Sequence, residues 1–290
     1  MSNNQRSIIK QRTTGNGQRT EDNQHPPTSI QYRASSIQYP ILFVGAGPGD
    51  PDLITVKGKK ALEDADVIVY AGSLVPHAVL KWADPDAVKI NSAPLALEEV
   101  IDRMCQAHEQ GKRVVRLHSG DPSLYSAIQE QIAELEKRSV PYEIIPGVTA
   151  AFAAAAAMGQ EYTLPEIAQS LIFTRMTGRT KVPEAESLES LAAHKTSMVV
   201  YLSISMIDEV SKLLAKSYGY NAPVVVAYRV SQPDQKIIHA RIKNLPEVVQ
   251  REGITRQALI IVGRVLEVKD AGLKERSKLY DKDFSHSFRK

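Results

Sequence analysis

Apolar and polar positions form two kinds of pattern along the chain. Short runs rich in Val, Ile and Leu, which are typical of buried strands, are separated by longer stretches whose apolar residues recur at the spacing of one helix face. A regular succession of strands and helices of this kind predicts an α/β fold.

The succession falls into two sets, which predict two α/β domains. In the first set, the expected strands are 41–44, 67–70, 88–90, 114–117 and 142–145, and the expected helices are 55–64, 97–109 and 124–137. In the second set, the strands are 170–174, 198–202, 224–228, 237–240 and 258–262, and the helices are 188–193, 207–217 and 246–251. An alanine run at 150–157 and a polar stretch at 159–170 lie between them. We therefore expect an N-terminal domain at 40–158 and a C-terminal domain at 159–268.

The two ends of the chain lack this periodicity. Residues 1–39 are rich in Gln, Asn, Ser and Thr and predict a disordered extension. A transit peptide is the alternative for 1–39 because no acid precedes Glu21, but the segment has no clear amphipathic helix. Residues 269–290 predict a flexible basic tail.

Composition and charge narrow the class of protein. With 43% hydrophobic and 24% charged residues, collagen-like and wholly disordered proteins are excluded. The net charge is +3, but five Lys/Arg against two Asp/Glu lie in 1–39 and seven against four in 269–290, which leaves 40–268 at −3. A nucleic-acid footprint needs basic residues gathered on the folded surface, so we expect no nucleic-acid partner.

Two further observations bear on location. The longest apolar run, 150–158, is about half the length that a helix needs to cross a bilayer. The single cysteine, Cys105, excludes an internal disulfide and a cysteine metal cluster, which suits a reducing compartment. We expect a cytoplasmic protein without a membrane partner.

A glycine-rich loop follows the first expected strand. In 45–51 (Gly-Ala-Gly-Pro-Gly-Asp-Pro), glycines let the backbone approach a ligand at the carboxyl edge of a sheet. A dinucleotide site would need Gly-x-Gly-x-x-Gly and an acid ending the second strand; here the third glycine comes one position early and the second strand ends in Tyr70-Ala71-Gly72. A tight turn without a ligand is the other explanation.

Two later loops carry a carboxylate and small residues. In 118–125 (His-Ser-Gly-Asp-Pro-Ser-Leu-Tyr), Asp121 either faces a ligand or caps the helix expected from 124. In 146–150 (Pro-Gly-Val-Thr-Ala), small side chains permit close helix packing or close approach of a ligand, and packing is the simpler explanation. Because all three loops follow strands of one sheet, together they describe a cleft.

At full length these segments resemble the tetrapyrrole methylases, S-adenosylmethionine-dependent enzymes with two α/β domains and an active site in the cleft between them. The resemblance covers about 40–268. Segment 44–58 is similar to the amino-terminal motif of the family, and 114–125 followed by Pro146-Gly147 is similar to its second motif. The resemblance implies a methyltransferase that works as a homodimer.

Within the family, 70–75, 147–157 and 174–184 resemble the subgroup that methylates carbon 11 of precorrin-4 or cobalt-precorrin-4 in cobalamin (vitamin B12) biosynthesis. The uroporphyrinogen-III methylases typically carry an aspartate after the tyrosine of the second strand, where this chain has Ala71. A uroporphyrinogen-III or another precorrin methylase is the alternative. A methylase of protein or RNA, and a non-catalytic binding module, are more distant ones.

The resemblance also implies which residues bind the methyl donor, S-adenosyl-L-methionine. They are Pro48, Ser119, Gly120, Asp121, Leu124, Tyr125, Thr149 and Ala150 in the first domain and Leu202, Ala227 and Ala258 in the second. Asp121 is the expected catalytic residue, through its placement of the donor.

The substrate of the family carries many carboxylates, so guanidinium groups are expected beside it. Arg175 and Arg179, which follow a strand of the second domain, are the candidates. Arg116, inside a hydrophobic strand, is equally well explained by an internal ion pair. No two histidines have the i,i+4 spacing of a metal site, so no resident metal is expected and any cobalt would enter with the substrate. His118 is either a hydrogen-bonded structural residue or a proton acceptor.

Overall fold

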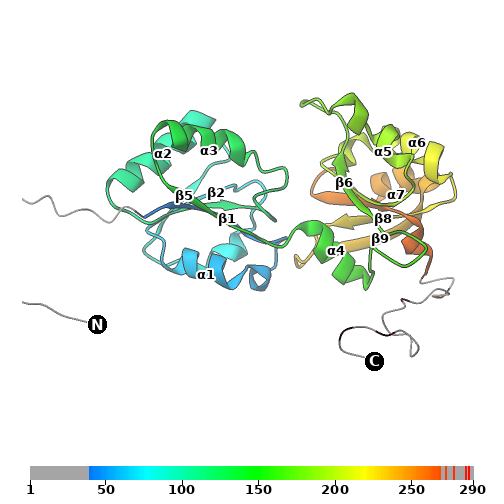
Figure 1. The fold of residues 1–290 in the computed structure, drawn as a ribbon, viewed down its shortest axis with the longest axis horizontal. Helices are drawn as coiled ribbons and strands as arrows, with labels where there is room; N and C mark the ends of the chain where they lie inside the picture. Colours follow the sequence, from blue (N-terminus) through cyan, green and yellow to red (C-terminus); the bar gives the residue numbers. More distant parts are fainter. Residues whose placement is uncertain (1–38, 269–271, 273–276, 278–284, 286, 288–290) are drawn as a thin grey trace, which may run out of the picture. The chain divides into compact units, whose positions relative to one another are not determined.

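The computed structural model describes residues 39–268, 272, 277, 285 and 287, and 39–268 lie within one compact unit (Figure 1). The predicted disordered extension at 1–39 and flexible tail at 269–290 fall almost wholly outside the described residues.

The first half of the described chain is a five-stranded parallel sheet covered by helices on both faces. Its strands are β1 (Ile41–Gly45), β2 (Val67–Tyr70), β3 (Val88–Asn91), β4 (Val114–His118) and β5 (Tyr142–Ile145), in the order β3-β2-β4-β1-β5. Its helices are α1 (Val56–Glu63), α2 (Leu97–Glu109) and α3 (Ile128–Lys137). Alternate strand residues face opposite sides: Val44 and Val115 lie in one cluster with residues of α1, and Phe43 and Val114 lie in another with residues of α2 and α3. Figure 1 shows α1 on one side of the sheet and α2 and α3 on the other.

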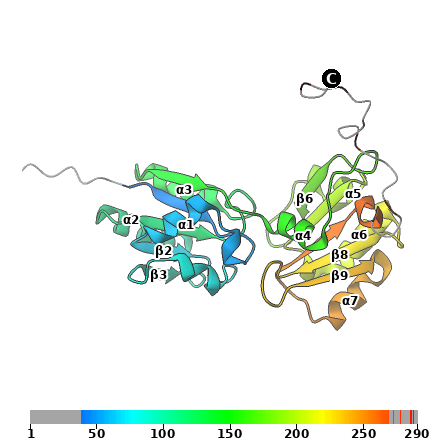
Figure 2. The same ribbon diagram turned by 90° about the horizontal axis from the view of Figure 1, so that it is seen from below.

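The second half is a mixed five-stranded sheet. Its strands are β6 (Leu171–Arg175), β7 (Ser197–Tyr201), β8 (Pro223–Tyr228), β9 (Lys236–Arg241) and β10 (Ala258–Val262), in the order β6-β7-β10-β8-β9. Only β6 and β7 run parallel. One face is covered by α5 (Leu188–Ala192), α6 (Ile207–Tyr218) and α7 (Leu245–Arg251), and the other by α4 (Ala150–Met158) (Figure 2).

Helix α4 packs with the second sheet, although the expected division at 158 groups it with the first domain. Its buried residues Ala151 and Ala154 lie in one cluster with Val199 and Val225. Small side chains on that face of the helix allow the helix to approach the strands closely.

The two sheets confirm the predicted α/β fold, and every predicted strand and helix is present. The largest difference in bounds is at α3, which begins at Ile128 rather than at 124, and several other elements differ by one residue at an end. Tyr125 and Ala127 have φ values of 55° and 49°, in the left-handed region that a right-handed helix does not include. In the part of the chain that the structure describes, no helix is long and apolar enough to cross a membrane.

Candidate active site

Three loops of the first half meet at the carboxyl edge of its sheet. Strands β4, β1 and β5 are parallel neighbours, so the loops 46–50, 119–127 and 146–149 leave them on the same side. Gly47 and Gly120 exchange two backbone hydrogen bonds, of 3.2 and 2.8 Å between N and O. The expectation that the three loops share one sheet edge is confirmed.

The three loops approach one another most closely at glycine backbone. A Cβ on Gly45 would lie 2.6 Å from the Cα of Gly147 and 2.7 Å from the carbonyl oxygen of Gly120, and a Cβ on Gly147 would overlap that same oxygen. We call Gly45, Gly120 and Gly147 the glycine floor. A Cβ on Gly120 would meet only the Cα of Thr149, at 3.8 Å, so the floor is open on that side. Packing requires Gly45 and Gly147, whereas Gly120 leaves room for a ligand.

Asp121 ties two of these loops together. One carboxylate oxygen accepts from the backbone N–H of Ser123 (2.8 Å) and the other from the N–H of Gly147 (2.9 Å). The interpretation of Asp121 as a helix cap is wrong, because α3 begins seven residues later at Ile128 with Ala127 at its N-cap. Its carboxylate instead fixes the spacing between the second and third loops.

Tyr201, at the end of β7, fixes the start of α4. Its hydroxyl hydrogen-bonds to Thr149 Oγ1 (2.7 Å) and accepts from the backbone N–H of Ala151 (3.2 Å). Burial raises the pKa of this hydroxyl, so it stays protonated at neutral pH. The sequence pattern did not identify Tyr201, although its place at a strand end beside Leu202 was a usable signal.

A loop of the second half reaches the first glycine loop. The backbone N–H of Asp50 donates to Ser231 Oγ (2.9 Å), and a Cβ on Gly49 would overlap the side chain of Gln232. Arg229 holds Gln232 in place, donating from Nε and Nη2 to its Oε1 at 2.9 and 2.8 Å. Gly49 therefore provides room for the Gln232 side chain, and no local sequence pattern indicates this contact.

Backbone strain gathers in the same region. Nine described residues other than glycine have positive φ, and six of them lie in the loops just discussed or in contact with them: Tyr125, Ala127, Leu202, Arg229, Ser231 and Gln257. Such conformations cost about 1–3 kcal/mol each and cluster at functional sites.

The residues expected to bind the donor differ in exposure. Side chains with accessible surface are Ser119, Asp121, Leu124, Tyr125, Ala150 and Leu202, whereas Pro48, Gly120, Thr149, Ala227 and Ala258 are buried. Ala227 is 0% exposed within β8 and offers a ligand no surface. The structure therefore brings the first-half set together around the glycine floor and places Ala227 inside the core.

The two candidate arginines have different surroundings. The guanidinium of Arg175 donates to the carbonyls of Met176 (3.3 Å), Thr180 (3.0 Å) and Lys181 (3.3 Å), so it braces the loop that carries Arg179. Arg179 itself is exposed and forms no ion pair with the described residues. Of the two arginines, Arg179 is therefore the better candidate to pair with a ligand carboxylate.

Arg116 and His118 are buried side by side on β4. Arg116 donates to Gln131 Oε1 and Ser92 Oγ, both at 2.9 Å, and has no carboxylate partner among the described residues, so the ion-pair interpretation is wrong. Burial lowers its pKa to about 10. His118 stacks on Phe43, and its Nε2 has no hydrogen-bond partner in the described chain, so it is packed rather than hydrogen-bonded at that atom.

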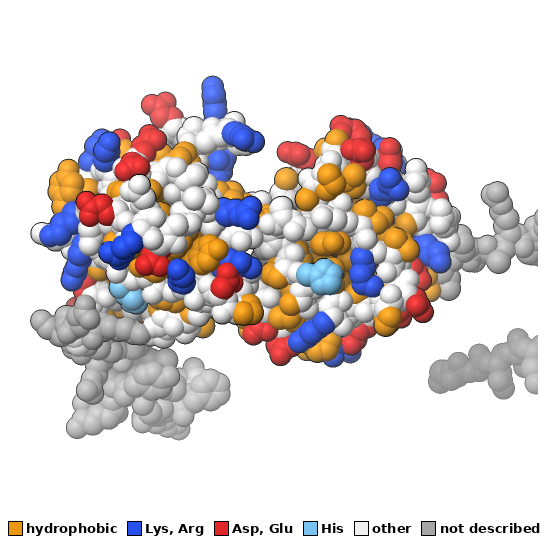
Figure 3. Space-filling view, turned by 180° about the vertical axis from the view of Figure 1, so that it is seen from behind, with side chains coloured by type: hydrophobic (Ala, Val, Ile, Leu, Met, Phe, Trp, Pro, Cys, Tyr) orange, Lys and Arg blue, Asp and Glu red, His pale blue; other side chains and the backbone are white. Residues whose placement is uncertain are grey.

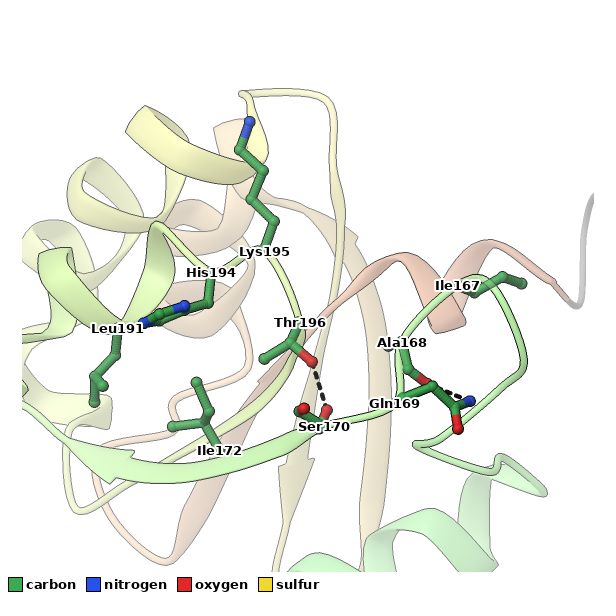
Figure 4. A pocket seen from close by; sticks show the side chains of 9 residues that line it. All are labelled: Ile167, Ala168, Gln169, Ser170, Ile172, Leu191, His194, Lys195 and Thr196. Carbon is green, nitrogen blue, oxygen red and sulfur yellow. Dashed lines mark hydrogen bonds between the residues drawn. The ribbon is translucent and has the colours of Figure 1, made fainter.

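Other candidate sites are few. Among the described residues, no group of three His, Cys, Asp or Glu could hold a metal ion. A surface pocket of the second half lies between 167–172 and 191–196, where Thr196 donates to the Ser170 carbonyl (Figure 4). It includes no residue of the three loops, and His194 and Lys195 are its only ionisable side chains.

Comparison with known proteins places this geometry in a family. A cobalt-precorrin-4 C(11)-methyltransferase of Methanocaldococcus jannaschii is 53% identical over 86% of this chain and 96% of its own length. The X-ray structure of a cobalt-precorrin-4 methyltransferase, a cobalamin biosynthetic enzyme, is 44% identical over 78% of this chain and 95% of that one, with a TM-score of 0.76. A uroporphyrin-III C-methyltransferase from Thermus thermophilus, complexed with S-adenosyl homocysteine, is 26% identical over 79% and 94%, with a TM-score of 0.64.

The family model of the tetrapyrrole (corrin/porphyrin) methylases matches residues 40–246, a span that includes the glycine floor, Asp121 and Tyr201. The chain belongs to the tetrapyrrole methylase family.

Proposed function

We propose that the chain transfers a methyl group from S-adenosyl-L-methionine to carbon 11 of cobalt-precorrin-4 or precorrin-4, a step of cobalamin biosynthesis. The observation that carries the proposal is the glycine floor, where three loops meet at the carboxyl edge of the first sheet and leave space beside Gly120, in a family of methylases. A related methyltransferase was crystallised with S-adenosyl homocysteine, the demethylated donor. The chain is 53% and 44% identical to cobalt-precorrin-4 enzymes and 26% identical to a uroporphyrin-III enzyme. This difference favours a substrate of the precorrin-4 type over uroporphyrinogen III.

The donor, when bound, would supply a methyl group on a positively charged sulfur; a nucleophilic carbon of the substrate would bond to that methyl group as the carbon–sulfur bond breaks and its electron pair passes to sulfur. The chain then needs no nucleophile of its own, and its residues act by holding two reactants in line. Such alignment is worth up to about 7–11 kcal/mol. We propose that Ser119, Gly120, Leu124, Tyr125, Thr149, Ala150, Pro48 and Leu202 bind the donor, with the buried Ala227 and Ala258 shaping the site from behind.

The functional test is the position of the new methyl group. Purified protein is incubated with ¹³C-methyl-labelled donor and, separately, cobalt-precorrin-4, precorrin-4 and uroporphyrinogen III, and the products are compared by NMR. We expect label at carbon 11 of a precorrin-4 substrate and little or none on uroporphyrinogen III, because Ala71 replaces the acid of those enzymes. Label at carbon 2 or 7 of uroporphyrinogen III would assign the chain to the sibling activity instead.

Asp121 is proposed as a positioning residue for the donor. Asp121→Asn leaves one oxygen for two backbone N–H donors, so either Ser123 or Gly147 loses its acceptor. We expect affinity for S-adenosyl homocysteine, measured by calorimetric titration, to fall about tenfold, the effect of one lost charge-assisted bond. The matched control is Asp52→Asn, an exposed acid nearby that is paired with Lys81. A lowered melting temperature with unchanged affinity would make Asp121 purely structural.

Arg179 is proposed to pair with a carboxylate of the substrate. Arg179→Ala is expected to raise the apparent KM for precorrin-4 about tenfold and to leave donor affinity unchanged, because the exposed guanidinium braces no part of the fold. Arg175→Ala releases three carbonyls of the same loop and should lower thermal stability as well. An unchanged KM for Arg179→Ala contradicts the assignment.

The homodimer, the cytoplasmic location and the absence of a nucleic-acid partner remain predictions. On the face seen in Figure 3, basic and acidic side chains are interspersed rather than gathered into a basic stripe, which supports the last of them. A solution mass of twice 32.0 kDa would support the dimer.

A further inference from the structure

Four aromatic rings form a continuous row beside the glycine floor. Tyr125, from the loop after β4, contacts Tyr201 on β7 with ring centroids 5.4 Å apart. Tyr201 contacts Phe173 on β6 at 5.8 Å, and Phe173 contacts Phe152 in the first turn of α4, also at 5.8 Å. We call Tyr125, Tyr201, Phe173 and Phe152 the aromatic row.

The row is buried in the middle and exposed at its ends. Tyr201 and Phe173 are half-buried, whereas Tyr125 is 41% and Phe152 is 54% exposed. Leu202, next to Tyr201, is 62% exposed. These three are among the largest apolar side chains left in solvent by the described chain, and a gathered apolar surface of this kind marks a binding site.

Packing of α4 does not explain Phe152. The helix packs against the sheet through Ala151, Ala153, Ala154 and Met158, whereas Phe152 is 54% exposed and contacts the sheet at Phe173. The start of the helix is held by Tyr201, whose hydroxyl accepts from the Ala151 N–H. The ring of Phe152 is therefore presented on a rigid turn, with one edge against Phe173.

Positive charge lies at the other end of the row. Arg175 pairs with Tyr201 in the parallel register of β6 and β7, so its side chain leaves the sheet on the same face as Phe173 and Tyr201. Burial raises the pKa of the Tyr125 hydroxyl, and the nearby charges of Arg175 and Glu186 act on that pKa in opposite directions. The loop that Arg175 braces also carries the exposed Arg179. A row of aromatic rings, tilted or edge-on to one another and bordered by guanidinium groups, suits a conjugated molecule with carboxylates at its rim.

We propose that the aromatic row is the shelf on which the tetrapyrrole ring rests, with Phe152 as the residue that contacts its face. This inference rests on the proposed function, since it names the part of the site that holds the methyl acceptor. The rigid Tyr201 and Phe173 fix the height of the shelf, and Phe152 and Tyr125 supply the contact.

The test compares Phe152→Leu, which keeps an apolar side chain, with Phe152→Tyr, which keeps the ring. The control is Tyr220→Leu, which removes a more exposed aromatic residue from the loop after α6 (68% exposed, against 54% for Phe152). Binding is measured by titration with uroporphyrin III, a stable flat octacarboxylate, and turnover is measured with cobalt-precorrin-4. Affinity for S-adenosyl homocysteine and the solution mass are recorded for every variant.

We expect Phe152→Leu to weaken uroporphyrin binding and to raise the KM for cobalt-precorrin-4 about threefold to tenfold, as loss of a ring contact predicts, with kcat and donor affinity unchanged. Phe152→Tyr and Tyr220→Leu should behave as the native chain. Unchanged binding in Phe152→Leu, equal loss of donor affinity, or a fall in solution mass that marks Phe152 as a contact between copies would each overturn the shelf. If the native chain binds uroporphyrin through Phe152 but turns over no precorrin-4, the proposed reaction fails and the shelf stands.

Discussion

Gly147→Ala is expected to abolish measurable donor binding and to lower the free energy of unfolding by about 3 kcal/mol, the upper range for overpacking in a close-packed interior. The new Cβ would overlap the carbonyl oxygen of Gly120 and lie 2.8 Å from the Cα of Gly45. These contacts, and a third of 3.0 Å to the carbonyl carbon of Gly45, are all with backbone, so no side-chain rotation relieves them. The third loop must then move away from the first two, and the N–H of Gly147 leaves Asp121.

The control for this substitution is Gly111→Ala. Gly111, unlike Gly147, has a positive φ, 74°, and a Cβ there meets nothing within 4 Å. We expect it to cost about 1–2 kcal/mol of stability through its backbone conformation alone and to leave donor binding intact. Chemical denaturation and calorimetric titration with S-adenosyl homocysteine separate the two variants. Donor binding retained in Gly147→Ala would show that the glycine floor does not shape the site.

The strands were predictable from short runs of apolar residues. β2, β5 and β10 have the predicted bounds, and of these β2 and β10 are buried apolar runs between polar segments, whereas β5 includes Glu143 and is largely exposed. The start of α3 was not predictable from periodicity, since Leu124 continues the apolar spacing of the helix while Tyr125 and Ala127 adopt left-handed backbone. Tertiary contacts determine that conformation, and they leave no trace in the local pattern.

The candidate site was predictable where glycine and carboxylate mark a loop, and not where a distant residue completes it. The loops of the glycine floor could be predicted because each contains a glycine shortly after the end of an apolar strand. The bond from Asp50 to Ser231 joins residues 181 positions apart, and that from Thr149 to Tyr201 joins residues 52 apart. Serine and tyrosine at such positions are ordinary in sequence, so only the folded chain identifies their role.

His118 is expected to make the fold sensitive to acid. Burial, and secondarily the charge of Arg116, lower the pKa of its imidazole to about 3, from about 6.5 in an unfolded chain. Between these two values the unfolded state binds a proton that the folded state does not, so the free energy of unfolding falls as the pH falls. Above pH 6.5 both states are neutral at this residue and the effect is absent.

Each pH unit in that window changes the free energy of unfolding by about 1.4 kcal/mol. Protonation of His118 alone should therefore lower the free energy of unfolding by about 3 kcal/mol between pH 6.5 and 4. His118→Phe, which keeps a ring against Phe43, and His118→Gln carry no proton in either state. Denaturation curves at several pH values should therefore show that the free energy of unfolding falls less with decreasing pH in both variants than in the native chain, whatever their stability at pH 7. Since Nε2 has no hydrogen-bond partner in the described chain, His118→Phe should lose little stability at neutral pH. Equal slopes for the native chain and both variants would mean that His118 takes up its proton without unfolding, and that water reaches the carboxyl end of β4.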